Sequence, residues 1–448
     1  MASHYLSLLM PELPSTSSRT DWATFESNAA LATNAVGVGP TLPLKIEVAL
    51  LTGGIDRPYV IGLSQALTSK GICLEVIGSD KLDGPEMRNA PGLHFMNLQQ
   101  FPPRNASFAR RALAILAFYF RFMRYVSTAK PNIFHILWNN KLQFFDRTLL
   151  MLYFKLRGKK IVFTAHNVNA RARDGNDSAL NRLTLRFQYR LADHIFVHTQ
   201  KMKSEITKHF GAHESAISII PFGVNNSLPE TDLTSVEAKQ RLGVGGAEKT
   251  ILFFGAIWPY KGLEYLVAAF RQLADRHKDY RLVIAGESKK GSEGYLDGVR
   301  RAIRQHVNPD RVIEKLQYIA DADTEVYFKA ADLLVLPYTA IFQSGVLYTA
   351  YKFGLPVVAT DVGAFKEDII EGRTGFVCKP CDPDDLARTI ETYFDSDLFK
   401  SLDIRRQEIR AYANLRNSWE TVGDMTRSVY AGLLGSRVTG DSSERNVS

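Results

Sequence analysis

The chain has 448 residues, of which 45% are hydrophobic and 23% charged, values that are ordinary for a globular protein. This length exceeds what one hydrophobic core usually supports, so we expect two domains. The formal net charge of +8 suits an anionic substrate, an anionic membrane surface or a nucleic acid, and does not distinguish among them. Three cysteines cannot build a disulfide framework, and we find neither a signal-peptide pattern nor an apolar run long enough for a membrane span. The sequence therefore predicts a cytoplasmic protein.

The N-terminal part predicts a leader followed by an α/β unit. Residues 1–43 are rich in Ser, Thr, Ala and Pro without periodicity, and we expect them to be disordered. An apolar strand at 45–51 is followed by a turn at Gly53 and Gly54, a helix, and a second strand at 74–77. This order is typical of a Rossmann-like domain. Because the turn lacks a full G-x-G-x-x-G, a dinucleotide cofactor is not expected.

Residues 101–160 carry twelve basic side chains and one acidic side chain. Within this segment, residues 110–125 predict an aromatic helix, with Phe118, Tyr119, Phe120 and Phe122, edged by Arg110, Arg111, Arg121 and Arg124. Two interpretations remain open: a packed helix with solvated arginines, or a helix that lies on an anionic bilayer beside a lipid-linked acceptor. No recognised nucleic-acid-binding motif accompanies the patch, so a nucleic-acid partner is not expected.

Three histidines follow at predicted strands. The strand at 160–164 leads to His166, just past the carboxyl end, where α/β folds bind their ligands. Imidazole can donate or accept a hydrogen bond there near neutral pH. His194 and His198 share one face of the next strand by their spacing of four, and we expect both to be chiefly structural.

The second half of the chain repeats the alternation of strands and helices after a polar linker at 225–247. A strand at 250–254 leads through Gly255 to Lys261 at a helix start, where an ammonium group can meet a phosphate. A later helix begins at Gln343, Ser344 and Gly345, and its first backbone N–H groups, those of Ser344, Gly345 and Val346, form a candidate anion site. The alternative is an ordinary loop in which Gly345 only permits close packing.

Four segments between residues 335 and 376, VLPY, QSGV, AYKFGLPVVATDVG and EGRTGF, resemble the donor-phosphate region of retaining glycosyltransferases of the GT-B architecture. This is the large group 1 family of bacterial mannosyl- and glucosyltransferases, and QSGV resembles one of its subgroups. The segment TAHNV at 164–168 resembles the strand-end histidine segment of the same family. The resemblance covers about residues 44–434.

The resemblance implies an α/β fold with two Rossmann-like lobes facing across a cleft. It places an acceptor lobe at 44–235, a nucleotide-sugar lobe at 236–415, and a helix at 416–436 that packs back on the first lobe. Residues 437–448 are expected to be a disordered tail. The resemblance also implies that His166 contacts the transferred sugar and that Lys261 holds the leaving diphosphate. The donor site implied in this way comprises Gly53, Gly54, Gly255, Lys261, Gln343, Ser344, Gly345, Val346 and Thr349.

Two features depart from the family pattern. Many members carry an arginine shortly before the lysine, whereas this chain has Ala256 after Gly255, and Trp258 where some members place the arginine. Two glutamates that often flank the phosphate loop correspond to Ile341 and Thr349. Losing one charge-assisted hydrogen bond costs about 1.5–3 kcal/mol, which weakens a donor site without abolishing it.

We therefore predict a retaining enzyme that moves a hexose from a nucleotide-diphosphate sugar to a sugar or lipid-linked acceptor, in cell-surface polysaccharide or glycolipid synthesis. It would act in the cytoplasm or on the inner face of the membrane. The nucleotide-sugar is a substrate, so no cofactor is expected. The resemblance also implies that no metal is needed, and we find no paired-Asp metal motif; Cys378 and Cys381 have the spacing of half a metal site but lack a second ligand pair. The alternatives are a nucleotide-sugar epimerase of the same fold and a catalytically silent scaffold of a polysaccharide-assembly complex.

Overall fold

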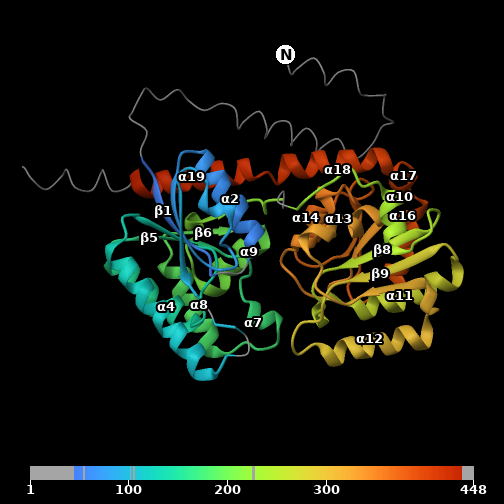
Figure 1. The fold of residues 1–448 in the computed structure, drawn as a ribbon, viewed down its shortest axis with the longest axis horizontal. Coiled ribbons are helices and arrows are strands. Elements are labelled where there is room, and N and C mark those ends of the chain that lie inside the picture. Colours follow the sequence, from blue (N-terminus) through green and yellow to red (C-terminus); the bar gives the residue numbers. More distant parts are fainter. Residues whose placement is uncertain (1–44, 54–55, 101, 104–105, 225–227, 436–448) are drawn as a thin grey trace, which may run out of the picture. The chain divides into compact units, whose positions relative to one another are not determined.

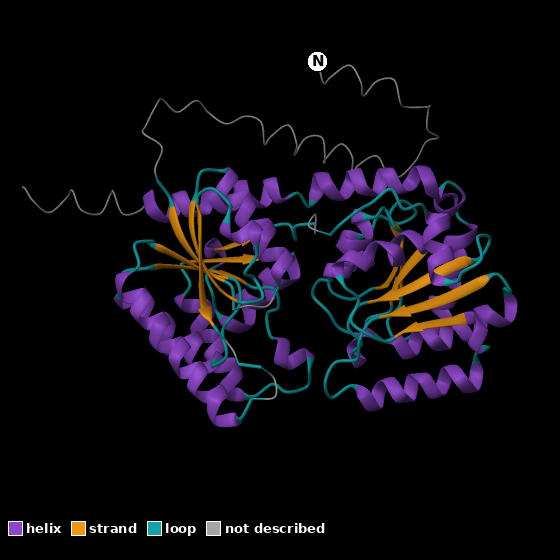
Figure 2. Cartoon of the chain, in the orientation of Figure 1, coloured by secondary structure: helices purple, strands orange, loops and turns teal. Residues whose placement is uncertain are grey.

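The computed structural model describes residues 45–53, 56–100, 102–103, 106–224 and 228–435. The predicted leader and tail, together with Gly54, lie outside these residues. Residues from Lys45 onward form one unit, which contains two parallel sheets. Figure 1 shows the course of the chain, and Figure 2 shows helices on both sides of each sheet. This is the doubly wound α/β architecture that the sequence predicts.

The first sheet, as far as the structure describes it, has seven strands in the order β3-β2-β1-β4-β5-β6-β7. They are β1 (Glu47–Leu51), β2 (Cys73–Ser79), β3 (Leu93–Gln99), β4 (Ile133–Ile136), β5 (Lys160–Thr164), β6 (His194–Val197) and β7 (Ile217–Ile219). The helices of this lobe include α2 (Arg57–Ser69), α4 (Phe108–Thr128), α6 (Met151–Leu156), α7 (Ala170–Arg173), α8 (Ala179–Leu191) and α9 (Gln200–Glu205). A π-helical turn, η1 (Asp146–Leu150), precedes α6.

The second sheet, counted over the same described residues, has six strands in the order β10-β9-β8-β11-β12-β13. They are β8 (Lys249–Phe254), β9 (Tyr280–Ala285), β10 (Val312–Lys315), β11 (Leu333–Leu336), β12 (Val357–Thr360) and β13 (Gly375–Cys378). The helices of this lobe include α10 (Ser235–Leu242), α11 (Leu263–Arg276), α12 (Glu293–His306), α13 (Asp321–Ala330), α14 (Gly345–Lys352), α15 (Phe365–Asp368), α16 (Pro383–Asp395), α17 (Asp397–Lys400) and α18 (Leu402–Arg416).

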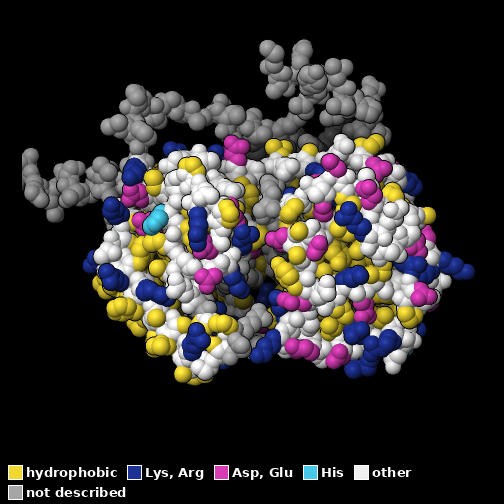
Figure 3. Space-filling view, viewed as in Figure 1, with side chains coloured by type: hydrophobic (Ala, Val, Ile, Leu, Met, Phe, Trp, Pro, Cys, Tyr) yellow, Lys and Arg dark blue, Asp and Glu magenta, His cyan; other side chains and the backbone are white. Residues whose placement is uncertain are grey.

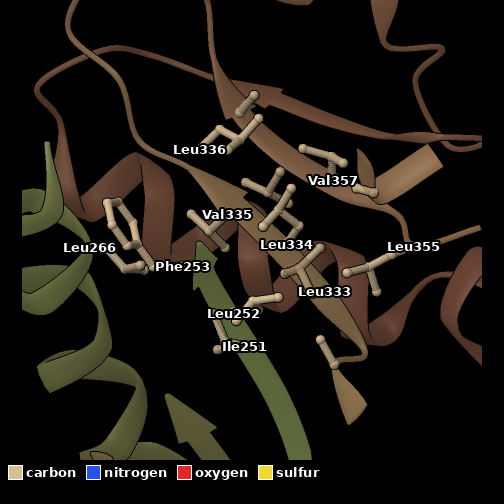
Figure 4. Close-up of a cluster of buried hydrophobic side chains, with 14 of the residues drawn as sticks. Ile251, Leu252, Phe253, Leu266, Leu333, Leu334, Val335, Leu336, Leu355 and Val357 are labelled. Atoms are coloured by element: carbon tan, nitrogen blue, oxygen red, sulfur yellow. The ribbon is translucent and has the colours of Figure 1, made fainter. Parts of the chain in front are cut away.

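Burial on both faces explains why the central strands are continuous apolar runs rather than alternating ones. All four residues of β11 are buried, and Leu333 and Leu334 pair with Ile251 and Leu252 of β8. Figure 4 shows these side chains packed against one another and against Val357 of β12. The central strands therefore hold rigidly the loops that leave their carboxyl ends.

The last helix, α19 (Trp419–Gly435), returns the chain to the first lobe, as predicted. Its Val422 and Tyr430 belong to the core of the first lobe, and Tyr430 contacts His135 of β4. Close approach to α2 requires a glycine, because a Cβ on Gly62 would lie 2.1 Å from Cε2 of Trp419. The preceding helix α18 instead packs against α14 in the second lobe.

Candidate functional site

A cavity of about 410 Å³ lies where loops of both sheets converge at the carboxyl ends of their strands. From the second lobe it is lined by Lys261, Gln343, Ser344, Gly345, Val346 and Thr349, all of which the sequence predicts to bind a donor. From the first lobe it is lined by residues that the sequence did not single out, among them Tyr59, Asn167 and Arg173. The switch from strand to helix at these loops is where α/β folds bind ligands.

The second-lobe wall of the cavity includes the start of α14. Gly345 and Val346 are the first residues of this helix, so their N–H groups have no carbonyl one turn earlier to bind. Ser344 occupies the N-cap position in an extended conformation and its side chain makes no cap hydrogen bond. The helix dipole adds partial positive charge at the same point. This end of α14 can therefore receive an anion.

The side chain of Gln343 is fixed by a buried hydrogen-bond chain. Its Nε2 donates to the hydroxyl of Tyr348, at 2.5 Å, and that hydroxyl donates to Oδ2 of Asp368, at 2.8 Å. Burial raises the pKa of Asp368 to about 6. The buried Oε1 of Gln343 has no partner among the described residues. Gln343, which lines the cavity, therefore has an amide oxygen that can still accept a hydrogen bond.

Lys261 ends a short 3-10 helix, Pro259–Lys261, and is only 7% exposed. Burial lowers the pKa of its ammonium to about 8. Its Nζ lies 5.3 Å from the ring centroid of Tyr338, and no carboxylate of the described residues pairs with it. A Cβ on Gly255, where φ is +100°, would lie 3.2 Å from this Nζ. The glycine thus leaves room for the ammonium group.

Arg173 brings a second cation to the cavity from the first lobe. It ends α7, and its guanidinium carbon lies 4.5 Å from the ring centroid of Tyr260. Its Nε donates to Oδ1 of Asp174, at 2.7 Å. The sequence did not reveal this role, because Arg173 is one of several basic residues in a polar stretch and only the fold places it opposite Lys261.

His166 lies at the carboxyl end of β5, as predicted, and is half-buried. Its ring stacks on that of Trp138, with centroids 4.2 Å apart and planes at 7°. Its Nδ1 lies 3.3 Å from Nε2 of His198. Burial, reinforced by His198 and His135, holds the pKa of His166 well below its usual value. The imidazole is therefore neutral at neutral pH.

His166 lines a second cavity, of about 150 Å³, rather than the first. Asn167 lines both, so the two cavities adjoin at this residue. Gly53 lines neither. It has φ +58°, and a Cβ there would lie 2.8 Å from the carbonyl oxygen of Trp138, so its visible role is to admit the tryptophan that stacks on His166.

The four predicted membrane arginines lie on α4, and none of them lines either cavity. Phe118, Tyr119 and Phe122 of this helix are buried in the core, so the aromatic cluster mainly packs the lobe. The opposite face exposes other apolar side chains, including Leu116, which is 63% exposed, and Phe120, which is 73% exposed. Figure 3 shows hydrophobic side chains gathered along this edge of the first lobe.

The described residues offer neither a metal-binding cluster nor a membrane-spanning helix. No group of three or more His, Cys, Asp or Glu side chains is placed to hold a metal ion. No described helix is long and apolar enough to cross a membrane. Cys378 is buried and Cys381 is exposed, both as free thiols.

Two family models match the chain, one in each lobe. A model described as Glycosyltransferase Family 4 matches residues 52–228, and one described as Glycosyl transferases group 1 matches residues 248–396. The first match contains His166 and Arg173, and the second contains Lys261 and the start of α14. The residues around the 410 Å³ cavity thus come from the matched segments of both lobes, apart from Trp419.

Curated relatives resemble part of the chain. The D-inositol 3-phosphate glycosyltransferase of Corynebacterium efficiens is 28% identical over 283 residues, which are 60% of this chain and 65% of that protein. The protein of the same name from Pseudarthrobacter chlorophenolicus is 29% identical over 248 residues, 54% of this chain and 57% of that protein. The chain therefore spans less than two thirds of the length of these relatives.

Solved structures resemble nearly the whole chain. Sucrose-phosphate synthase from Thermosynechococcus elongatus aligns with a TM-score of 0.70 at 19% identity, covering 88% of this chain and all of the other. Anabaena HepE, in its complex with UDP-glucose, aligns with a TM-score of 0.67 at 18% identity, covering 87% and 100%. At these identities the likeness concerns the fold, which is the two-lobed GT-B architecture.

Proposed function

We propose that this chain, a member of the group 1 glycosyltransferase family with the GT-B fold, moves a hexose from a nucleotide-diphosphate sugar to an acceptor hydroxyl with retention of configuration. The observation that carries the proposal is the cavity in which the start of α14 and the buried Lys261, which has no carboxylate partner among the described residues, line the same space. A buried ammonium without a carboxylate is costly unless an anion joins it.

In this proposal the second lobe stabilises the leaving group. The N–H groups of Ser344, Gly345 and Val346 donate to the diphosphate, while Lys261 supplies a full positive charge. These groups are in place before the reaction, so the negative charge that develops on the diphosphate is stabilised without reorganisation. Oε1 of Gln343 would accept from a hydroxyl of the donor, replacing one carboxylate that the family pattern leads one to expect.

Arg173 would compensate for the arginine that Ala256 and Trp258 leave out. It lines the cavity with Lys261, although it belongs to the first lobe. Arg173 already donates to Asp174 through Nε and one terminal nitrogen, so its remaining N–H groups would donate to the phosphate oxygens beside Lys261.

Retention follows if the acceptor attacks the face of the sugar that the diphosphate leaves. The bond between C1 and the phosphate oxygen breaks, a bond from C1 to the acceptor oxygen forms, and the acceptor proton passes to a phosphate oxygen. His166 is neutral, so its role is to accept a hydrogen bond from a sugar hydroxyl near the reacting centre rather than to supply positive charge. Asn167, between the two cavities, lies at the expected boundary of donor and acceptor.

We also propose that the exposed face of α4 contacts an anionic membrane that carries the acceptor. The apolar side chains Phe108, Leu113, Leu116 and Phe120 are exposed there, beside Arg110, Arg111 and Arg124. Leu149 of η1 and Leu152 and Leu156 of α6 are also exposed, and α6 contacts α4 through Phe154 and Phe122. A basic and apolar surface of this kind suits an anionic bilayer.

A panel of nucleotide-sugars tests the activity. Release of nucleoside diphosphate that requires a sugar or lipid-linked acceptor supports transfer, and the anomeric configuration of the product decides retention. Interconversion of sugars without an acceptor would instead indicate an epimerase. No release across the panel, together with no donor binding, would favour a silent scaffold.

A further inference from the structure

The second cavity, of about 150 Å³, is lined by residues of the first lobe, among them His166. One water molecule occupies about 30 Å³ in the liquid, so the cavity has room for a small polar group. Its polar lining consists mainly of uncharged side chains. These are Asn139, Gln143, Thr164, His166, Asn167 and Gln188. One charged residue, Arg147, joins them.

Arg147 is held in place but not neutralised. It is 9% exposed and lies on the π-helical turn η1. Its two terminal nitrogens donate to amide oxygens, one to Oδ1 of Asn181 at 2.8 Å and the other to Oε1 of Gln143 at 3.3 Å. Its buried Nε has no partner among the described residues. A guanidinium has five N–H donors, so several remain for a ligand.

Among the described residues, the carboxylate whose charge acts on Arg147 is that of the adjacent Asp146, and it forms no direct ion pair with the guanidinium. Oδ1 of the adjacent acid, Asp146, accepts a hydrogen bond of 2.7 Å from the hydroxyl of Tyr119. Burial raises the pKa of Asp146 to about 7, so at neutral pH this acid is only partly charged. Arg171 adds further positive charge near Arg147. Burying a guanidinium without a full counter-ion is expensive, so binding of an anionic group here would stabilise the folded protein.

We propose that this cavity binds an oxyanionic group of the acceptor, a phosphate ester or a carboxylate, through Arg147. Asn167 joins the cavity to the donor site, so a group on Arg147 would hold the acceptor with a hydroxyl near His166. The assignment to an acceptor rests on the proposed transferase function. The anion site itself rests only on the burial of Arg147 and its unpartnered Nε.

The anion site is tested first without any turnover, with inorganic phosphate as the probe. Because phosphate also suits the donor site, the comparison uses Lys261→Ala as the background. Unfolding temperature is followed against phosphate concentration at fixed ionic strength, since a ligand that binds the folded state stabilises it. We expect phosphate to raise the unfolding temperature of the Lys261→Ala variant. The same rise is expected in the double variant Lys261→Ala, Arg186→Met, which is the control because Arg186 is an exposed arginine of α8. The rise should be lost in Lys261→Ala with Arg147→Met.

Equal stabilisation with and without Arg147 overturns the proposal. If Arg147→Met does not fold, Arg147→Lys takes its place, because lysine keeps the charge and loses the planar fork that binds an oxyanion in a bidentate manner. We then expect a phosphate dissociation constant at least about threefold weaker than with arginine, and an unchanged constant would count against the proposal.

The acceptor assignment is tested with matched pairs of acceptors. One pair is a sugar with and without a phosphate, a second is a hexuronic acid and its hexose, and a third compares a lipid-diphosphate-linked sugar with the free sugar. We expect Arg147→Met to reduce the preference for the anionic member, as a ratio of kcat/KM, by at least about tenfold, mainly through KM. An unchanged ratio in every pair overturns the assignment. If no acceptor turns over while phosphate binding still depends on Arg147, the transferase proposal fails and the anion site stands.

Discussion

Nδ1 of His166 lies 3.3 Å from Nε2 of His198, and this contact fixes the tautomer of His166. Nδ1 of His198 lies 3.1 Å from the carbonyl oxygen of Ile220, to which it can only donate. With burial lowering the pKa of His198 to about 4, its Nε2 carries no proton and accepts from His166. The buried Nε2 of His166 is therefore an acceptor, and it has no partner among the described residues.

This tautomer predicts that His166→Ala lowers kcat at least about a hundredfold, because a hydrogen bond made near the reacting sugar is lost. Steady-state kinetics measures the effect. The matched control is His194→Ala at the start of β6, a residue that lines neither cavity. If the His166 variant keeps its activity and loses much of its stability, the histidine is a packing residue.

The pKa of Lys261 predicts the alkaline side of the pH profile. In the free protein the ammonium is charged below about pH 8 and becomes neutral as the pH rises through that value. Since only the charged form attracts the diphosphate, kcat/KM should fall above about pH 8, towards a limiting slope of one decade per pH unit. Donor binding raises this pKa, so kcat should fall at a higher pH than kcat/KM does.

Two variants of Lys261 test whether its ammonium causes the fall of kcat/KM at alkaline pH. Lys261→Ala should raise the donor KM at least about tenfold and lower kcat, because the cation at the leaving group is lost. Lys261→Arg should remove the fall near pH 8, since a guanidinium stays charged to above about pH 12. If the arginine variant keeps the same limb, another group titrates there.

Arg173 should act on the donor although it lies in the first lobe. Arg173→Ala is expected to raise the donor KM about tenfold, because one charge-assisted contact to the diphosphate is lost. Isothermal titration with the nucleoside diphosphate measures the same effect without an acceptor. Arg182→Ala, at an exposed arginine of α8 that lines neither cavity, is the control. Identical affinities in the two variants would place Arg173 outside the donor site.

Membrane binding is predicted to depend on three arginines of α4. Reversal of Arg110, Arg111 and Arg124 to glutamate should release the protein from anionic vesicles, since each basic side chain near such a surface contributes about 1 kcal/mol. Arg121 is left in place because it donates to the carbonyl oxygen of Leu98, at 3.0 Å, and so supports the fold. Vesicle co-sedimentation at rising salt is the measurement, because the Debye length falls from about 10 Å at 0.1 M to about 3 Å at 1 M.

The apolar part of the same face requires its own variant. Changing Leu113, Leu116 and Phe120 to serine should weaken binding to anionic vesicles without altering its salt dependence. Neutral vesicles are the control, because insertion of apolar side chains alone would bind both kinds. Vesicle binding that survives both sets of changes would falsify the proposal for this face.

Gly62 should be required for docking of the C-terminal helix. Gly62→Ala is expected to lower the free energy of unfolding by about 1–3 kcal/mol, because its Cβ would overlap Trp419. Gly432→Ala is the matched control on α19, where a Cβ meets nothing within 4 Å, and it should stabilise the helix by up to about 1 kcal/mol. Urea unfolding compares the two. An unchanged free energy of unfolding in Gly62→Ala would mean that α19 can move away from α2 without loss of stability.

The local pattern along the chain was enough to predict the α/β fold and half of the candidate site. Buried parallel strands require continuous apolar runs, and a helix that begins with glycine after such a strand leaves its N–H groups free. These are short-range properties, so the sequence alone was enough to predict β11, the start of α14 and the position of Lys261 at a helix start. The roles of the individual site residues remain predictions.

The first-lobe half of the site depended on contacts between distant residues. Arg173 meets Tyr260 across 87 positions of sequence, and Arg147 meets Asn181 across 34. Nothing in the sequence separates these arginines from the solvated ones, because a basic side chain looks the same whether the fold places it beside a cavity or in the solvent. On α4, likewise, the aromatic residues that suggested a membrane face mostly pack the core. The sequence alone determined which segments become strands and helices, since those follow from local periodicity and backbone geometry. Only the tertiary structure decided which charges stay unpaired when buried, since that depends on what the fold brings next to them.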